Sequence, residues 1–339
     1  MIAEQPTATA TALKPNRRIE IIDILRGLAL LAMATYHFTW DLEFFGYARA
    51  GLTAFGPWKI YARCIASTFL FLVGVSLVLA HGRGIRWPGF WKRLGMIVAA
   101  ALAITAVTYF ATPDSFIFFG ILHQIALASV LGLAFLRVPA LLSLLIAALV
   151  IAAPHYLRSS FFDHPALQWV GLSTVDPRSN DYVPLFPWFG VVLAGMSATA
   201  LAASTGLLAR LAEIPHVRWT SPLTFIGRHS LAFYLIHQPA LIACVWLFSQ
   251  ILPPEARSPQ TNFTEACQAS CANTRDAAFC TRYCGCMLGR LEKGGMLDSL
   301  YKGGQDAALQ QRVRDLASTC TAETDGLTGQ DMAPTEDKP

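Results

Sequence analysis

Residues 17–41 read RRIEIIDILRGLALLAMATYHFTWD, and this stretch decides the class of the protein. Two arginines precede about twenty mainly apolar residues, and at about 1.5 Å per residue such a helix crosses a hydrocarbon core of about 30 Å. The stretch therefore predicts a transmembrane helix. At about 100° per residue, its four central ionisable side chains fall on one third of the circumference. They are Asp23, Arg26, His37 and Asp41.

This polar face marks a candidate functional site. An ionisable group inside a membrane costs several kcal/mol unless it is paired or faces a wet cavity. Arg26 and His37 stand eleven positions apart on the face, about three helical turns. The alternative involves no chemistry: Asp23 and Arg26 pair at the cytoplasmic interface, and His37 reaches towards the opposite one.

The composition places the rest of the chain in the same class. Hydrophobic residues make up 54% and charged residues 14%, whereas a soluble domain has roughly 25% charged residues. The net charge of +4 is spread over loops and forms no basic tract, so we expect no nucleic-acid partner. The apolar run after residues 1–18 is too long for a signal peptide and lacks a clear cleavage site, which predicts a retained first helix.

The fold class expected is all-α: a polytopic membrane helix bundle of about seven or more transmembrane helices, with a small disulfide-rich helical C-terminal tail. After the first span, six more are predicted at about residues 60–80, 94–111, 116–136, 141–153, 185–208 and 223–252. Pro154 is expected to end the fifth span. Arginines and lysines occupy alternate loops, which predicts a cytoplasmic N-terminus and, with seven spans, an extracytoplasmic C-terminus. The long loop 155–184 is either a functional cover or simply mobile.

Three segments are expected: a cytoplasmic segment 1–18, a transmembrane domain 19–252 and an extracytoplasmic tail 253–339. Six of the eight cysteines lie in the tail: Cys267, Cys271, Cys280, Cys284, Cys286 and Cys320. Two pairs have helical spacing, so a helical hairpin would bring them together. This favours the bridges Cys267–Cys284 and Cys271–Cys280 and leaves Cys286 for Cys320, one of fifteen pairings that sequence alone does not fix.

The alternative for these cysteines is a metal site. The tail contains no histidine and is expected outside the cytoplasm, so we expect disulfides and no metal. So short a segment buries little core, which favours a disulfide-stapled cap or interaction module.

Further polar groups lie in later spans. His123, in the first turns of the fourth span at its extracytoplasmic end, is either a catalyst or an interhelical hydrogen bonder. His237 and Gln238 precede Pro239 and are suited to satisfying the carbonyl group that this proline frees. Arg228 is either an interface anchor or a phosphate ligand.

Four segments in order resemble a known family. They are EIIDILRGLALLAMATYHFTWDL (20–42), FIFFGILHQIA (116–126), DYVPLFPWFGVVLAG (181–195) and RHSLAFYLIHQP (228–239). The chain resembles bacterial members of the heparan-α-glucosaminide N-acetyltransferase catalytic-domain family over about residues 17–250, but its cysteine tail departs from the family pattern. It also resembles the wider transmembrane acyltransferase superfamily, whose type-3 members carry an Arg, ten residues and a His in the first helix, as Arg26 and His37 do.

The resemblance implies transfer of an acetyl or other acyl group from cytoplasmic acyl-CoA to an extracytoplasmic sugar or cell-envelope glycan. His37 is then expected to act as base or acyl carrier, and Asp41 to orient its imidazole ring. The expected further residues are His123 as a catalytic candidate, Arg26, Arg93 and Arg228 for acyl-CoA, and Asp23, His237 and Gln238 as polar support.

The resemblance also implies a bacterial inner membrane location, with membrane lipid as a partner. Acetyl-CoA or another acyl-CoA is expected as co-substrate, and no tightly bound cofactor or metal is expected. The sequence is compatible with a homo-oligomer and does not decide the oligomeric state. A different class, a non-enzymatic transporter or channel lined by the polar face, is the main alternative, although no inverted repeat is evident. A membrane anchor for the tail would not need so many spans.

Overall fold

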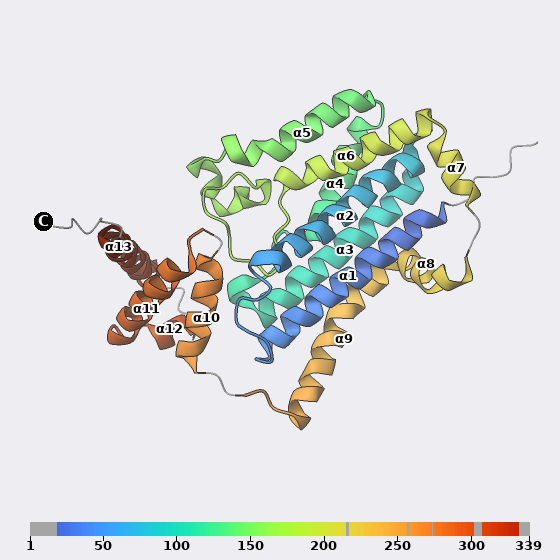
Figure 1. Cartoon of the computed structure of the whole chain (residues 1–339). Helices are drawn as coiled ribbons and strands as arrows, with labels where there is room; N and C mark the ends of the chain where they lie inside the picture. Colours follow the sequence, from blue (N-terminus) through green and yellow to red (C-terminus); the bar gives the residue numbers. More distant parts are fainter. Residues whose placement is uncertain (1–18, 215–216, 256–257, 273, 302–306, 332–339) are drawn as a thin grey trace, which may run out of the picture.

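The computed structural model describes residues 19–214, 217–255, 258–272, 274–301 and 307–331. In these ranges the chain forms α-helices and short 3-10 helices, with no strand (Figure 1). The expected cytoplasmic segment 1–18 lies outside the described residues. The all-α fold class is therefore confirmed.

Seven apolar helices build the membrane part. Five of them are long and apolar enough to cross a membrane: α1 (Glu20–Phe44), α2 (Gly56–His81), α3 (Trp87–Ala111), α6 (Leu185–Ser204) and α9 (Ser230–Ile251). The other two are shorter: α4 (Ile121–Phe135) and α5 (Ala140–Tyr156). Together they make the chain a multi-pass membrane protein.

Several predicted helix boundaries were wrong: α3 begins at Trp87 instead of residue 94, and α4 at Ile121 instead of residue 116. Pro154 lies inside α5, which continues to Tyr156, because a proline so close to the end removes little of the remaining hydrogen-bond ladder. The sixth span ends at Ser204 instead of residue 208, since Gly206 adopts a left-handed φ of 72° before the short helix α7 (Leu207–Glu213).

The seventh predicted span is two helices. The first is α8 (Ser221–Arg228), and the chain turns at His229 into α9. The N–H group of His229 is shared between the carbonyl oxygens of Phe225 and Ile226, at 3.1 and 3.2 Å, a pattern common at helix ends. The hydrophobic run 223–252 hides this break because α8 contributes Leu223, Phe225 and Ile226 directly before the apolar helix α9.

The helix bundle has two ends, which we call the arginine end and the loop end. At the arginine end α1 begins, α2 finishes and α3 begins; at the loop end α1 finishes, α2 begins and the long loop 157–184 leads into α6. The tail follows α9 at the loop end, where the hydroxyl group of Tyr47 donates to the carbonyl oxygen of Leu252 (Figure 1). The tail thus lies at the end of the bundle opposite to the start of α1.

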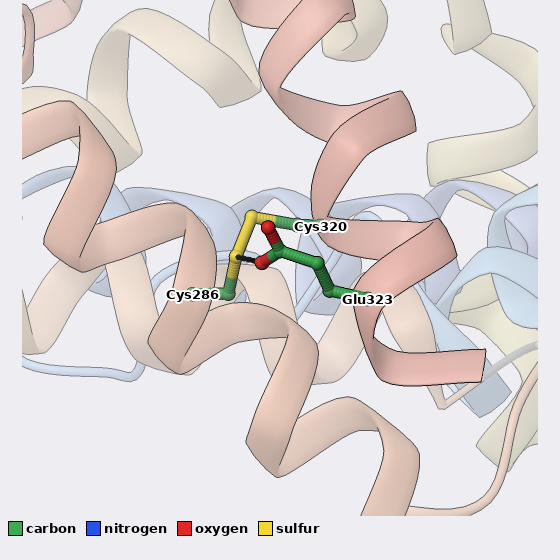
Figure 2. Close-up of side chains that lie close together, drawn as sticks. All are labelled: Cys286, Cys320 and Glu323. Atoms are coloured by element: carbon green, nitrogen blue, oxygen red, sulfur yellow. Dashed lines mark hydrogen bonds between the residues drawn. A yellow bond between two sulfur atoms is a disulfide. The ribbon is translucent and has the colours of Figure 1, made fainter. Parts of the chain in front are cut away.

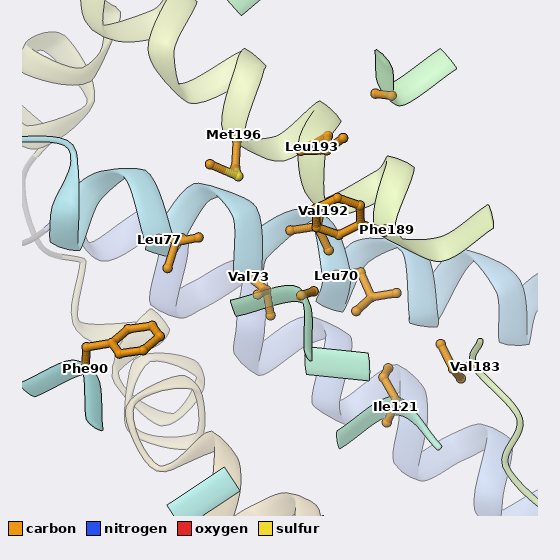
Figure 3. Packing of buried hydrophobic residues seen from close by; sticks show 12 residues of the cluster. Leu70, Val73, Leu77, Phe90, Ile121, Val183, Phe189, Val192, Leu193 and Met196 are labelled. Carbon is orange, nitrogen blue, oxygen red and sulfur yellow. The ribbon is translucent and has the colours of Figure 1, made fainter. Parts of the chain in front are cut away.

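The largest buried cluster lies between α2 and α6 (Figure 3). Leu70 of α2 and Val192 and Leu193 of α6 are fully buried in it. Glycines bring the two backbones together: a Cβ atom on Gly74 would lie 2.1 Å from the carbonyl oxygen of Val192. Such close approach is how membrane helices gain packing energy without a hydrophobic driving force.

The tail has a fold and a small core of its own. It contains α10 (Pro259–Cys271), α11 (Ala277–Lys293), α12 (Leu297–Tyr301) and α13 (Ala307–Asp331). Disulfides join Cys267 to Cys284, Cys271 to Cys280 and Cys286 to Cys320, the pairing that the helical spacing favours. Leu291 and Leu297 are buried beside the third bridge. Asp276 caps α11 by accepting from the N–H group of Phe279, and this bond lowers the pKa of its carboxyl group.

Candidate active site

Polar side chains of α1 and α9 meet inside the loop-end half of the bundle. The Asp41 side chain is 0% exposed, and its Oδ1 atom accepts a 2.8 Å hydrogen bond from Nε2 of Gln238. Asp41 Oδ2 and Gln238 Oε1 are buried and have no hydrogen-bond partner within the described part of the chain. A buried acceptor without a donor costs about 1–3 kcal/mol, so these two atoms indicate a site made for a polar ligand.

Two histidines form a pair in the same region. The ring centroids of His37 and His237 lie 5.1 Å apart. Nδ1 of His237 lies 2.7 Å from the carbonyl oxygen of Tyr234, and because a carbonyl only accepts, Nδ1 is assigned the proton. The neutral ring then has a bare Nε2 atom, which is buried and has no hydrogen-bond partner among the described residues. This lone pair is available to take a proton.

Asp41 has a different partner from the one expected. We expected it to orient His37, but among the hydrogen bonds of the described residues none joins these two side chains. The carboxylate instead holds Gln238, the neighbour of His237 in α9. Residues 41, 237 and 238 are thereby linked across two helices that are far apart in sequence.

A second polar cluster lies at the arginine end. Arg26 bonds to the buried Asp23 carboxylate at 2.9 Å and also donates to the hydroxyl oxygen of Ser76. Arg228 lies 3.6 Å from the other carboxylate oxygen of Asp23 and 3.5 Å from Glu20. Two arginines and two acids thus form one network between α1, α8 and α2.

The α1–α8 contact is made by two glycines. A Cβ atom on Gly27 would lie 2.3 Å from the carbonyl oxygen of Leu223, and one on Gly227 would lie 1.9 Å from that of Asp23. Only glycine permits backbones so close. This contact places Arg228 beside Asp23, which the sequence did not reveal because the two residues lie on helices at opposite ends of the domain.

A pocket opens near this network, between α2, α3 and α4. Its polar lining residues are His81, Arg93 and Ser129, and the rest of its wall is apolar. Nδ1 of His81 accepts from the backbone N–H group of Arg86 at 3.2 Å, so the proton of the neutral ring lies on Nε2. Arg93 was expected at a ligand site, whereas His81 was missed, although its position in the last turn of α2 next to a basic loop was a usable signal.

His123 has partners for both ring nitrogens. Its Nδ1 atom accepts from the N–H group of Gly120 at 3.2 Å, which puts the proton on Nε2. Nε2 lies 3.1 Å from the hydroxyl oxygen of Thr105, whose own proton goes to the carbonyl oxygen of Ile117. The next residue, Gln124, is fully buried, and neither amide atom of its side chain has a partner in the described ranges.

The long loop contributes one partly buried acid at the site, Asp181. Its Oδ2 atom accepts from the N–H group of Ile121 at 2.8 Å, at the N-terminus of α4. Burial raises the pKa of Asp181 to about 6, although the bond from Ile121 acts in the opposite direction. A Cβ atom on Gly120 would lie 2.3 Å from this carboxylate, so the glycine makes room for it.

The only group of potential metal ligands found in the described residues lies in the tail (Figure 2). It consists of Cys286, Cys320 and Glu323, but the two sulfur atoms are bonded to each other. Metals bind the thiolate form of cysteine, so this group is no metal site in the oxidised protein. Glu323 also forms an ion pair with Arg290.

Residues 18–239 match the family model described as heparan-alpha-glucosaminide N-acetyltransferase, catalytic. The chain belongs to this family. Membership in the heparan-α-glucosaminide N-acetyltransferase catalytic family makes it a membrane acetyltransferase, and the match includes every residue of both polar clusters. It ends inside α9, before the disulfide-bonded tail. No curated protein and no solved structure matches the chain.

Proposed function

We propose that the protein transfers an acetyl or other acyl group from cytoplasmic acyl-CoA to a sugar or glycan on the other side of the membrane. The observation that carries this proposal is the pair formed by the partly buried His37 and the buried His237, next to unpartnered acceptors on Asp41 and Gln238. A hydroxyl or amine acceptor offers the donors that these atoms lack. Such an environment suits a proton transfer that water does not disturb.

The donor is proposed to bind at the arginine end, which the positive-inside rule assigns to the cytoplasm. Arg93 and His81 offer N–H donors in a pocket whose other lining residues, apart from Ser129, are apolar, a combination that fits phosphate groups attached to a partly apolar arm. Two further arginines belong to the network near this pocket. Arg228 pairs with Asp23, and Arg26 donates to Ser76. From Arg26 to His37 is about 16 Å along the helix, so the acyl-bearing arm extends towards His37 through the bundle.

His37 is proposed as base or acyl carrier. In direct transfer, the acceptor oxygen or nitrogen forms a bond to the thioester carbonyl carbon, the carbon–sulfur bond breaks, and histidine passes the acceptor proton to the leaving thiolate. In the alternative, a ring nitrogen of His37 attacks the carbonyl carbon, CoA leaves as its thiol, and the acceptor then displaces the imidazole. His237, with its bare Nε2, is positioned to receive a proton in either case.

We assign His123 a structural role, since both of its nitrogens are engaged within the protein. Its neighbour Gln124 is the better candidate for contact with the acceptor, because its buried amide lacks partners. Asp41 and Gln238 are proposed to hold the α9 histidine in place relative to α1.

The test is transfer of label from radiolabelled acetyl-CoA by membranes that contain the wild type, His37→Ala or His123→Ala. We expect CoA release and labelled envelope glycans with the wild type, loss of both with His37→Ala, and retained turnover with a correctly folded His123→Ala. Full activity of His37→Ala would remove this residue from the mechanism. No turnover and no CoA binding across a broad acceptor panel would favour the transporter instead.

A further inference from the structure

The loop between α1 and α2, residues 45–55, touches the tail and the segment leading to it. The hydroxyl group of Tyr47 donates to the carbonyl oxygen of Leu252, and its ring lies 5.5 Å from that of Phe248. Further along the loop, a Cβ atom on Gly51 would lie 3.5 Å from the Cα atom of Ala266 in α10. The loop therefore passes close to the first helix of the tail, within reach of a methyl group added at Gly51.

Inside the bundle the same loop is fixed by Glu43 of α1. The carboxylate of Glu43 accepts from the backbone N–H groups of Gly51 and Thr53, at 2.5 and 3.0 Å, and from the Thr53 hydroxyl group at 2.7 Å. The carbonyl oxygen of Thr53 in turn accepts from the hydroxyl group of Tyr36 at 3.4 Å. The ring of Tyr36 lies 5.7 Å from that of His37.

The helix that contacts the loop is held by covalent bonds. Two disulfides join α10 to α11, and a third joins α11 to α13. Isolated helices of this length are marginal in water, and small domains need such cross-links for stability. The surface that α10 presents to Gly51 thus depends on the bridges, and the family match does not extend to it.

We infer that the disulfide-bonded tail is a clamp that holds the α1–α2 loop in the position that shapes the loop-end site around His37. The loop lies beside the tail where Gly51 approaches Ala266, and it is hydrogen-bonded to α1 through Glu43, Thr53 and Tyr36. The effect on catalysis rests on the proposed function, but the effect on the loop does not. Contact alone is no proof of coupling, so the test measures the loop itself.

The first experiment inserts a protease site between Pro254 and Ser258 of the full chain and compares uncut protein with protein whose tail has been cut off and removed. The readout is hydrogen exchange of residues 45–55, above all the amides of Gly51 and Thr53, which the Glu43 carboxylate protects. We expect at least about tenfold faster exchange without the tail. Equal exchange in both samples would overturn the clamp.

The second experiment keeps the tail and disturbs the contact. Ala266→Trp enlarges the α10 residue whose Cα atom approaches Gly51, whereas Gln260→Trp is a matched control six positions earlier, exposed and about 240° around α10. Only Ala266→Trp should speed exchange in the loop and raise KM for the acceptor several-fold. Thiol alkylation checks that the three bridges still form, and equal behaviour of both variants would contradict the inference.

The two readouts separate the proposals. Exchange needs no turnover, so a wild type without acyl transfer would refute the proposed function and leave the exchange result valid. Normal transfer with an unchanged loop after tail removal would refute the clamp alone.

Discussion

The contact between α1 and α8 predicts a large effect of adding a single methyl group at Gly27. The Cβ atom of Gly27→Ala would lie 2.3 Å from the carbonyl oxygen of Leu223, whereas carbon–oxygen contacts in proteins begin at about 3.3 Å. The helices must therefore separate by about 1 Å. Alanine gains about 1 kcal/mol over glycine in a helix, but overpacking costs about 1–3 kcal/mol. The ion pair between Arg228 and Asp23, already at 3.6 Å, also lengthens.

Gly95→Ala is the matched control. Gly95 also lies inside a helix, α3, but a Cβ atom there meets nothing within 4 Å. The assay is thermal unfolding of the detergent-solubilised protein with and without acetyl-CoA. The unfolding temperature of Gly95→Ala should equal or exceed that of the wild type. The unfolding temperature of Gly27→Ala should be lower, and acetyl-CoA should raise it by less than it raises that of the wild type. Equal unfolding temperatures of the two variants would refute the close-contact argument.

Three further predictions concern single groups. His237→Gln should keep the fold but lower kcat at least about 100-fold, because an amide takes up no proton; a change in KM alone would contradict a role as base. Asp181 has a folded-state pKa of about 6 against an ordinary 3.8, so its folded form binds more protons between these pH values and stability falls as pH rises through them. Asp181→Asn, which still accepts from Ile121, should flatten this slope in thermal unfolding between pH 4 and 6, by at most about 3 kcal/mol. Alkylation should reach no cysteine other than the free Cys64 and Cys244 before reduction and six more after it; reactive tail thiols in the native protein would contradict the bridges.

Hydropathy and helical periodicity were sufficient for the fold class. The apolar runs located all seven helices of the bundle, with ends up to seven residues away, since burial in lipid demands long apolar segments whatever their packing. Breaks within such runs were not predictable. The turn at His229 depends on α8 crossing α1 at Gly27 and Gly227, a contact between segments about 200 residues apart.

The sequence predicted which polar residues form the candidate site, but it did not predict which of them contact one another. The polar face of α1 was evident because charged groups are rare in apolar helices. The bond from Gln238 to Asp41 and the approach of His237 to His37 depend on which face α9 turns towards α1, and a span that is apolar almost all round does not reveal its face. In the tail, helical spacing alone favoured the pairing that the structure has, because the two CxxxC segments lie on adjacent helices.

Helix α1 is synthesised long before the helices that supply most of its contacts. Helix α1 has its most extensive contacts with α8 and α9, which are synthesised about 180 residues after it, and fewer with its neighbour α2. Until they arrive, Arg26 has Asp23 within its own helix and Ser76 of α2, but Asp41 lacks the amide of Gln238. A nascent chain that stops after α6 therefore leaves the Asp41 carboxylate without the amide that binds it in the folded protein.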